Sequence, residues 1–154
     1  MVFNEHGQFH GEFRPPISDK TNLIDSKNES FLPLNIALNK SHVFVTDDWT
    51  AGNCVRIFCK KNKNLIRNIS NLEVYNPCGL LIDKVNNFLY TLGHLYYENG
   101  SLHLFCFDLS NNQENNLVRK IDLTVNADIK DMALDTVNCT LYCTGEKQLQ
   151  VFKF

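Results

Sequence analysis

The side chains of this sequence that could perform chemistry are scattered and form no recognisable catalytic arrangement. The five histidines include no His-Glu-x-x-His motif, with which many zinc enzymes hold their metal, and the one pair four residues apart, His6 and His10, lacks the glutamate after its first histidine. The sequence also contains no Gly-x-Ser-x-Gly nucleophile motif and no phosphate-binding loop. We therefore predict that this chain is not an enzyme and has no catalytic residue, no metal site and no cofactor.

Two groups of aspartates are candidates for paired carboxylates, of which one could act as general acid and the other as general base. The first is Asp47 with Asp48, and the second is Asp131 with Asp135. Asp135 and Asp83, however, follow two similar strand-like segments at equivalent positions. Aspartate favours turns because its carboxylate accepts hydrogen bonds from the backbone that follows. A turn-forming role is therefore the more economical prediction for Asp83 and Asp135.

The six cysteines show no spacing that points to a metal or to a redox motif. There is no Cys-x-x-Cys pair, and Cys139 and Cys143 are poorly spaced as zinc ligands. The N-terminus lacks the basic start and apolar stretch of a secretion signal. We predict reduced thiols that pack as small hydrophobic side chains in a cytoplasmic protein.

Length and composition indicate one folded domain. The chain has 154 residues, of which 44% are hydrophobic and 21% charged, the balance of a globular protein. A net charge of −2 gives no overall positive field for nucleic acid. No apolar run approaches the roughly 18 residues of a membrane helix, so we predict no membrane association.

A repeated strand pattern runs along the chain. Three segments each contain an aliphatic residue, an aromatic residue and a small or β-branched residue before a polar or glycine stop: Val43–Asp47, Leu89–Gly93 and Leu141–Gly145. They start at positions 43, 89 and 141, which are 46 and then 52 residues apart. Spacings of this size are typical of repeats built from four strands.

The repeat extends to strands on both sides of these segments. The preceding strands alternate apolar and polar residues, as a strand with one buried face does: Pro33–Asn39, Pro77–Asp83 and Ile129–Asp135. The third strands are Val55–Phe58, Leu104–Phe107 and Leu149–Phe152, and the fourth strands are Leu65–Ile69 and Leu117–Ile121. At the N-terminus, Val2–Asn4 and Phe9–Phe13 match a third and a fourth strand.

With the four strands called a to d, the predicted order is c-d, a-b-c-d, a-b-c-d, a-b-c. This is an all-β chain with almost no helix, because no window shows a sustained 3.6-residue period. Stacking four-stranded sheets radially buries both of their faces, so we predict a partial β-propeller of about three blades. The predicted units span residues 1–13, 32–70, 76–123 and 129–154. An immunoglobulin-like sandwich, which would lack an internal repeat, is the alternative.

The units resemble NHL repeats, the blades of the C-terminal propellers of tripartite-motif ubiquitin ligases. Pro77–Asp83 followed by Leu89-Tyr90 matches the first half of the NHL pattern, and Val43–Asp47 followed by Val55–Phe58 matches the second half. Val2–Phe9 is similar to the hairpin between strands c and d. The resemblance covers nearly the whole chain and implies a domain that binds a protein or an RNA.

The sequence departs from the NHL pattern at two positions. Asn35 stands where the family prefers glycine, and Gly93 stands where it prefers aspartate. A WD40 propeller fits less well, because the single tryptophan, Trp49, ends no strand c. The family's propellers usually have about six blades. We therefore expect a fragment of a longer protein. The alternative is a half-propeller that pairs with itself, in which one strand c would be left over.

The resemblance places the b–c and d–a loops at one end of the blades. These loops are long and carry aromatic and charged residues of the types that anchor interfaces. The candidate binding residues are Arg14, Lys20, Asp47, Asp48, Trp49, His94, Tyr96 and Tyr97. The alternative for Tyr96 and Tyr97 is a structural role, in which they only extend the hairpin between strands b and c.

The leading functional hypothesis is a non-catalytic module that binds a protein partner through these loops, and it extends to recruiting the substrate of a ubiquitin ligase. If the parent protein resembles the tripartite-motif ligases, its RING and B-box would lie outside this chain. RNA binding is the second hypothesis, since aromatic side chains also stack on single-stranded bases. The basic run Lys60–Lys63 falls on a c–d turn at the opposite end, where we interpret it as solvated. The third hypothesis is a fragment of a propeller enzyme with a metal in its channel.

Overall fold

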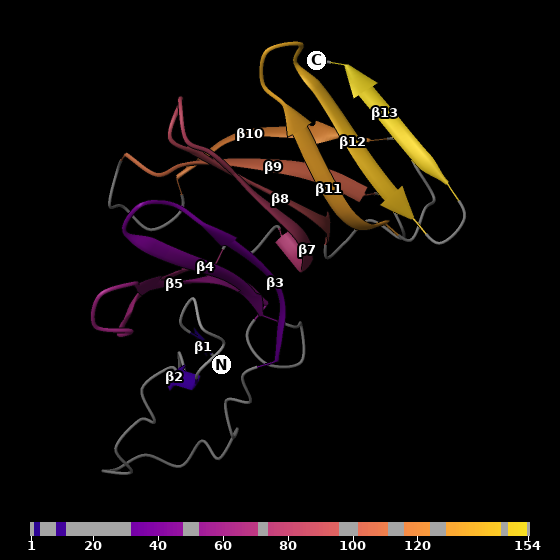
Figure 1. The fold of residues 1–154 in the computed structure, drawn as a ribbon. Coiled ribbons are helices and arrows are strands. Elements are labelled where there is room, and N and C mark those ends of the chain that lie inside the picture. Colours follow the sequence, from indigo (N-terminus) through magenta and orange to yellow (C-terminus); the bar gives the residue numbers. More distant parts are fainter. Residues whose placement is uncertain are drawn as a thin grey trace.

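The fold consists of β-strands joined by turns and loops (Figure 1). The computed structural model describes residues 2–3, 9–11, 32–47, 53–70, 74–95, 102–110, 116–123, 129–145 and 148–153. Within these ranges there are thirteen strands and no helix, so none of the described segments is a helix able to cross a membrane.

The strands form one hairpin and three antiparallel sheets. The N-terminal hairpin pairs β1 (Val2–Phe3) with β2 (Phe9–Gly11). The first sheet contains β3 (Pro33–Leu38), β4 (His42–Asp47), β5 (Cys54–Cys59) and β6 (Leu65–Ile69). The middle sheet contains β7 (Val74–Asp83), β8 (Phe88–Leu95), β9 (Leu102–Asp108) and β10 (Leu117–Asp122). The last sheet contains β11 (Ile129–Asp135), β12 (Thr140–Gly145) and β13 (Leu149–Lys153).

In all three sheets each strand pairs with its neighbour in the sequence, which confirms the predicted a-b-c-d order. The middle sheet differs in one respect, because β7 starts three residues before the expected Pro77, at Val74. Its register shifts between Tyr75 and Cys78 and again between Cys78 and Leu80, so two bulges let the longer strand stay paired with β8. The N-terminal hairpin also forms, although its place in an outer blade stays a prediction.

The middle sheet lies between the other two and packs against both (Figure 1). On one face, Leu80, Leu89 and Phe105 join side chains of the first sheet in one core. On the other face, Leu92 and Leu104 join side chains of the last sheet in a second core. A sheet with both faces covered buries alternate residues in two different cores, which explains why β9 is buried almost throughout.

The inner strands β3, β7 and β11 lie side by side and join the sheets at one edge. At this seam the backbone N–H of Gly79 on β7 donates to Oδ1 of Asn35 on β3, with 3.0 Å between the two atoms. Gly79 has a φ of +66°, and a Cβ there would lie 3.3 Å from both Leu92 Cδ1 and Met132 Cγ. Glycine therefore lets β7 approach the last sheet. Asn35, which departs from the NHL pattern, ties the first sheet to the middle one.

Two of the a–b turns are built identically from an aspartate. The backbone N–H groups of Val85 and Asn86 donate to Asp83 Oδ1, and Asn86 Nδ2 donates to Asp83 Oδ2 over 2.7 Å. Asp135 accepts the same three hydrogen bonds from Val137 and Asn138. The predicted turn-forming role of both aspartates is thus confirmed.

None of the six cysteines forms a disulfide, and Cys54, Cys106 and Cys143 are buried. Burial, followed by the nearby Cys78 and Asp131, raises the pKa of Cys143 to about 11. A thiol with this pKa stays protonated at neutral pH and is a poor nucleophile. This supports the structural role predicted for the cysteines.

We expect Asp83→Ala to destabilise the protein by about 1–3 kcal/mol, because the change removes a carboxylate that is only 3% exposed and leaves the N–H groups of Val85 and Asn86 without their acceptor. Burial alone would raise the pKa of Asp83, but the hydrogen bonds from Asn86 and Val85 lower it overall. A lowered folded-state pKa stabilises the protein above the unfolded value near 3.8, and that contribution is lost as the pH falls through the folded value. Urea unfolding should therefore separate wild type from Asp83→Ala at neutral pH and bring them together below about pH 4.

Asp135→Ala is the matched comparison, because its turn has the same hydrogen bonds and is exposed. The hydrogen bonds from Asn138 lower the pKa of Asp135, so the sign of its pH dependence is the same. We expect its effect to be smaller than that of Asp83→Ala. Equal effects would contradict burial as the reason for the difference.

Candidate binding surface at the loop end

The register of the strands gathers the b–c loops and the starts of the inner strands at one end of the sheets. In the first sheet, Pro33 pairs with Asp47, and Asp47 pairs with Cys54. In the middle sheet, Val74 pairs with Leu95, and His94 pairs with Leu102. We call this the loop end, and the opposite end, with the a–b and c–d turns, the turn end. In these two sheets the strand ends that flank the b–c and d–a loops therefore lie at one end, as the family resemblance implied.

Asn53 holds the loop ends of two sheets together. This residue precedes β5 and has a φ of +51°, a conformation that asparagine tolerates better than most residues. Its Nδ2 donates to the carbonyl oxygen of Val74 over 2.8 Å, and its Oδ1 accepts from the backbone N–H of Asn76. In the sequence, Asn53 follows Gly52 between two predicted strands, a position typical of a turn. Its amide fixes the start of β7 against the b–c loop of the first sheet.

Asp47 has a different role from the one predicted. It was a candidate contact residue, but the structure leaves it 0% exposed, so it cannot contact a partner from the surface. Its Oδ2 pairs with Arg56 Nε, and its Oδ1 accepts from the backbone N–H of Leu32 over 2.8 Å. Asp47 therefore holds the start of β3 against β4 and β5. The sequence shows only that Arg56 lies within an otherwise apolar segment, Cys54–Cys59, and does not identify Asp47 as its partner.

His94 is the one predicted contact residue that the structure describes near the surface. It is half-buried close to the end of β8, where its neighbours in register are Tyr75 and Leu102. This places His94 where the second b–c loop begins. The other candidates lie outside the described residues: Arg14, Lys20, Asp48, Trp49, Tyr96 and Tyr97.

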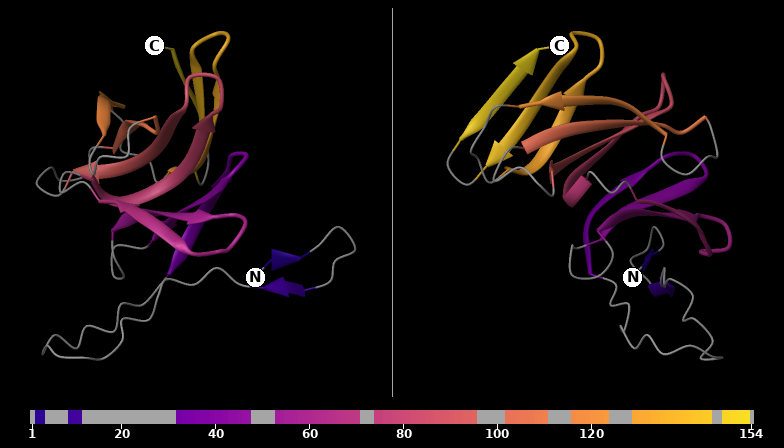
Figure 2. Two further views of the ribbon diagram at one scale, coloured as in Figure 1. Left: turned by 90° about the vertical axis from the view of Figure 1, so that its left-hand side faces the viewer. Right: turned by 180° about the vertical axis from the view of Figure 1, so that it is seen from behind.

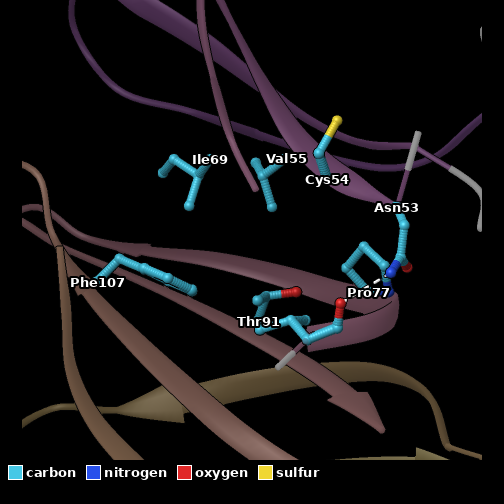
Figure 3. Close-up of a pocket in the computed structure, with 8 residues that line it drawn as sticks. Asn53, Cys54, Val55, Ile69, Pro77, Thr91 and Phe107 are labelled. Carbon is cyan, nitrogen blue, oxygen red and sulfur yellow. Dashed lines mark hydrogen bonds between the residues drawn. The ribbon is translucent and has the colours of Figure 1, made fainter. Parts of the chain in front are cut away.

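A small cavity lies between the first and middle sheets beneath Asn53 (Figure 3). Val55, Ile69 and Phe107 give it mostly apolar walls, and Thr91 lies on its floor. Its volume is about 10 Å³, roughly the space of one water molecule. The hydroxyl of Thr91 already donates to the carbonyl oxygen of Gly79 over 2.9 Å. The cavity is a packing space between sheets, too small for a substrate.

Within the described ranges, no three His, Cys, Asp or Glu side chains group closely enough to hold a metal ion. The candidate carboxylate pair Asp131 and Asp135 is spread along β11, where Asp131 pairs with Thr144 and Asp135 with Thr140. Four residues along a strand separate them by about 13 Å. These two carboxylates therefore cannot share one proton-transfer site. Asp48, in the other candidate pair, lies outside the described residues.

No protein-family model matches the sequence, and no curated protein matches it. Among solved structures, a chain of Kuenenia stuttgartiensis hydrazine synthase, a protein that contains a β-propeller, has a similar fold with a TM-score of 0.59. The alignment covers 86% of this chain and 36% of that chain, at 13% sequence identity. At this identity the similarity concerns the fold alone. The described sheets form part of a β-propeller with antiparallel blades of three or four strands.

The buried Asp47–Arg56 pair yields a stability prediction. Arg56→Met should destabilise the protein by about 3–5 kcal/mol, because it leaves the Asp47 carboxylate buried without its cation. Adding Asp47→Asn removes that charge and keeps an acceptor for the Leu32 N–H, so the double variant should regain most of the loss. Urea unfolding midpoints measure both effects. Arg119→Met, at an exposed position, is the control, and equal midpoints for it and Arg56→Met would contradict the assignment.

Proposed function

We propose that this chain is a non-catalytic, NHL-like recognition module that presents its loop end to a protein partner. The observation that carries the proposal is the arrangement of the loop end. The strand registers bring the b–c loops and the starts of the inner strands together there, and Asn53 and the Asp47–Arg56 pair hold their bases. A rigid base lowers the entropic cost of ordering loops when a partner binds.

The proposed contacts are the aromatic and charged side chains of these loops. Trp49 belongs to the first b–c connection, Tyr96 and Tyr97 belong to the second, and His94 precedes the second. Asp48 accompanies Trp49, while Arg14 and Lys20 belong to the connection before β3. Tryptophan, tyrosine and arginine contribute most to interface hot spots, because they bury a large area at little entropic cost. Recruitment of a substrate to a ubiquitin ligase is the role we propose for such a contact.

The test compares partner capture by the wild type and by a Trp49→Ala/Tyr96→Ala variant. Losing two interface anchors should weaken capture by at least about 30-fold, which corresponds to roughly 2 kcal/mol. Val85→Ala/Val137→Ala is the matched control, because both valines are exposed on a–b turns at the turn end. Quantitative mass spectrometry of captured proteins gives the readout, and thermal melting checks that each variant folds. Unchanged capture by the Trp49→Ala/Tyr96→Ala variant would show that the loop end is not the site.

RNA binding is the second candidate, and a charge asymmetry favours it. Lys40, Lys60, Lys61 and Lys63 lie on two neighbouring turns at the turn end, where the Lys60 N–H donates to the Ser41 carbonyl oxygen. The turn segments 39–42 and 59–64 contain no aspartate or glutamate. These two turns therefore carry a local positive charge, although the chain as a whole has a net charge of −2. Lysines in such a cluster can pair with backbone phosphates.

Electrophoretic mobility shifts with single-stranded RNA at two salt concentrations test this candidate. Lys60→Ala/Lys61→Ala should weaken binding and reduce the slope of log affinity against log salt by about 1.4, or 0.7 per phosphate contact. Arg119→Ala/Lys120→Ala removes two exposed cations from within β10, away from the turns, and should leave the slope unchanged. If wild-type protein shifts no RNA, or if both variants lose the same slope, the turn end is not an RNA site.

A further inference from the structure

The last sheet has an apolar side that the structure leaves uncovered. On the side facing away from the middle sheet, Tyr142, Leu149 and Val151 are 38%, 62% and 52% exposed. These three are adjacent, because Tyr142 pairs with Val151 and Leu149 lies two residues before Val151 on β13. We call this surface the trailing side of the last sheet, and the equivalent sides of the other two sheets their trailing sides.

The repeat shows what such a side is built to contact. In the middle sheet the equivalents of Leu149 and Val151 are Leu104 and Cys106, which are only 1% and 5% exposed. Leu104 is buried in the core between the middle and last sheets. The trailing side of the first sheet is covered in the same way by the middle sheet, through Phe44 and Ile57. Among the three described sheets, only the last has a trailing side that no other described sheet covers.

The side chains that cover a trailing side come from the inner strand of the next sheet. Leu80 and Ile82 of β7 pack on the first sheet, and Met132 and Leu134 of β11 pack on the middle sheet. Their equivalents on β3 are Ile36 and Leu38.

In contrast to these packed pairs, Ile36 is 65% exposed and Leu38 is 48% exposed. The chain thus has one uncovered trailing side at one end of its stack of sheets and one uncovered inner-strand pair at the other end.

We propose that a second copy of this chain covers the last sheet, with Ile36 and Leu38 of each copy packed on Tyr142, Leu149 and Val151 of the other. Each copy uses both surfaces once, so two copies close into a symmetric ring of six sheets. The contact repeats the packing already present twice within one chain. An unrelated apolar partner would have to imitate an inner strand, whereas a second copy carries one that is uncovered.

The free strand edges fit the same arrangement. In the first and middle sheets the third strand pairs on its outer edge with a fourth strand, β6 or β10. In the last sheet the third strand is β13, which pairs within the described residues with β12 alone.

A fourth strand for β13 is available in the second copy. Within the described residues, β2 pairs only with β1, which leaves its other edge without a partner strand. The hairpin lies at the end of the molecule nearer the first sheet, and β13 lies at the opposite end (Figures 1 and 2). Within one copy β2 does not reach β13. In the proposed dimer, the second copy's β2 is the fourth strand of the last sheet, and β1, which pairs with β2, follows as a fifth strand at the outer edge.

This surface is separate from the loops of the proposed function, so its test needs no outside partner. Light scattering coupled to gel filtration should give a discrete mass of twice 17.7 kDa for the wild-type chain. Val151→Lys and Ile36→Lys each place a charge in the contact, and each should shift the protein to the monomer mass. Both positions are exposed within one copy, so the variants should still fold. Val118→Lys, at a position 58% exposed on β10, is the control and should remain dimeric.

A mixing experiment establishes which surfaces meet. The Val151→Lys variant keeps an intact β3 surface, and the Ile36→Lys variant keeps an intact trailing side. Mixed together, the two monomeric variants should regain dimers through one intact contact, at a higher concentration than the wild type needs. Wild-type monomers, a polydisperse wild-type aggregate, or dimers of Ile36→Lys alone would each overturn the proposal. Dimers of Ile36→Lys alone would mean that two trailing sides meet each other instead.

Discussion

The contact on which this fold depends is the packing of two aliphatic side chains of each inner strand against the preceding sheet. Leu80 and Ile82 make it for the first sheet, and Met132 and Leu134 make it for the middle sheet. Each fully buried aliphatic side chain contributes about 1.5–3 kcal/mol, so two pairs supply a large part of the stability of a small domain. Because this contact lies at the inner edge, it also sets the order in which the sheets stack. The loop ends of neighbouring sheets come together as a consequence.

A second set of interactions is polar and fixes the position of one sheet along the next. Apolar packing alone is non-directional and would let the sheets slide. Asn35 prevents this at the inner seam by accepting from the Gly79 N–H, and Asn53 prevents it at the loop end by bonding Val74 and Asn76. Both asparagines reach from the first sheet to β7. Apolar side chains therefore provide the free energy of the interface, while two amides determine its register.

The strands and their order could be predicted from sequence, because each strand shows a two-residue apolar period or an apolar run. These patterns recur at similar distances along the chain, 46 and 52 residues. The Asp83 and Asp135 turns were predictable for a similar reason, since their hydrogen bonds reach only two or three residues ahead. Asp47 was not predictable in this way. Its partner Arg56 lies nine residues away on the next strand, so its burial depends on pairing that only the folded sheet creates. The early start of β7 is also a tertiary effect, because Asn53 of another sheet binds Val74 there.

The same distinction between local and tertiary signals explains how the candidate surfaces should be ranked. An aromatic residue in a loop, such as Trp49, has a local signal that is equally compatible with binding and with ordinary packing. The exposed residues of β3 and β13 carry more information, because the chain contains two packed copies of the same positions. Leu104 shows what the position of Leu149 does when a sheet covers it, and Leu80 shows the same for Ile36. In a repeat protein the interior of one interface is thus a direct guide to what an uncovered equivalent surface can bind.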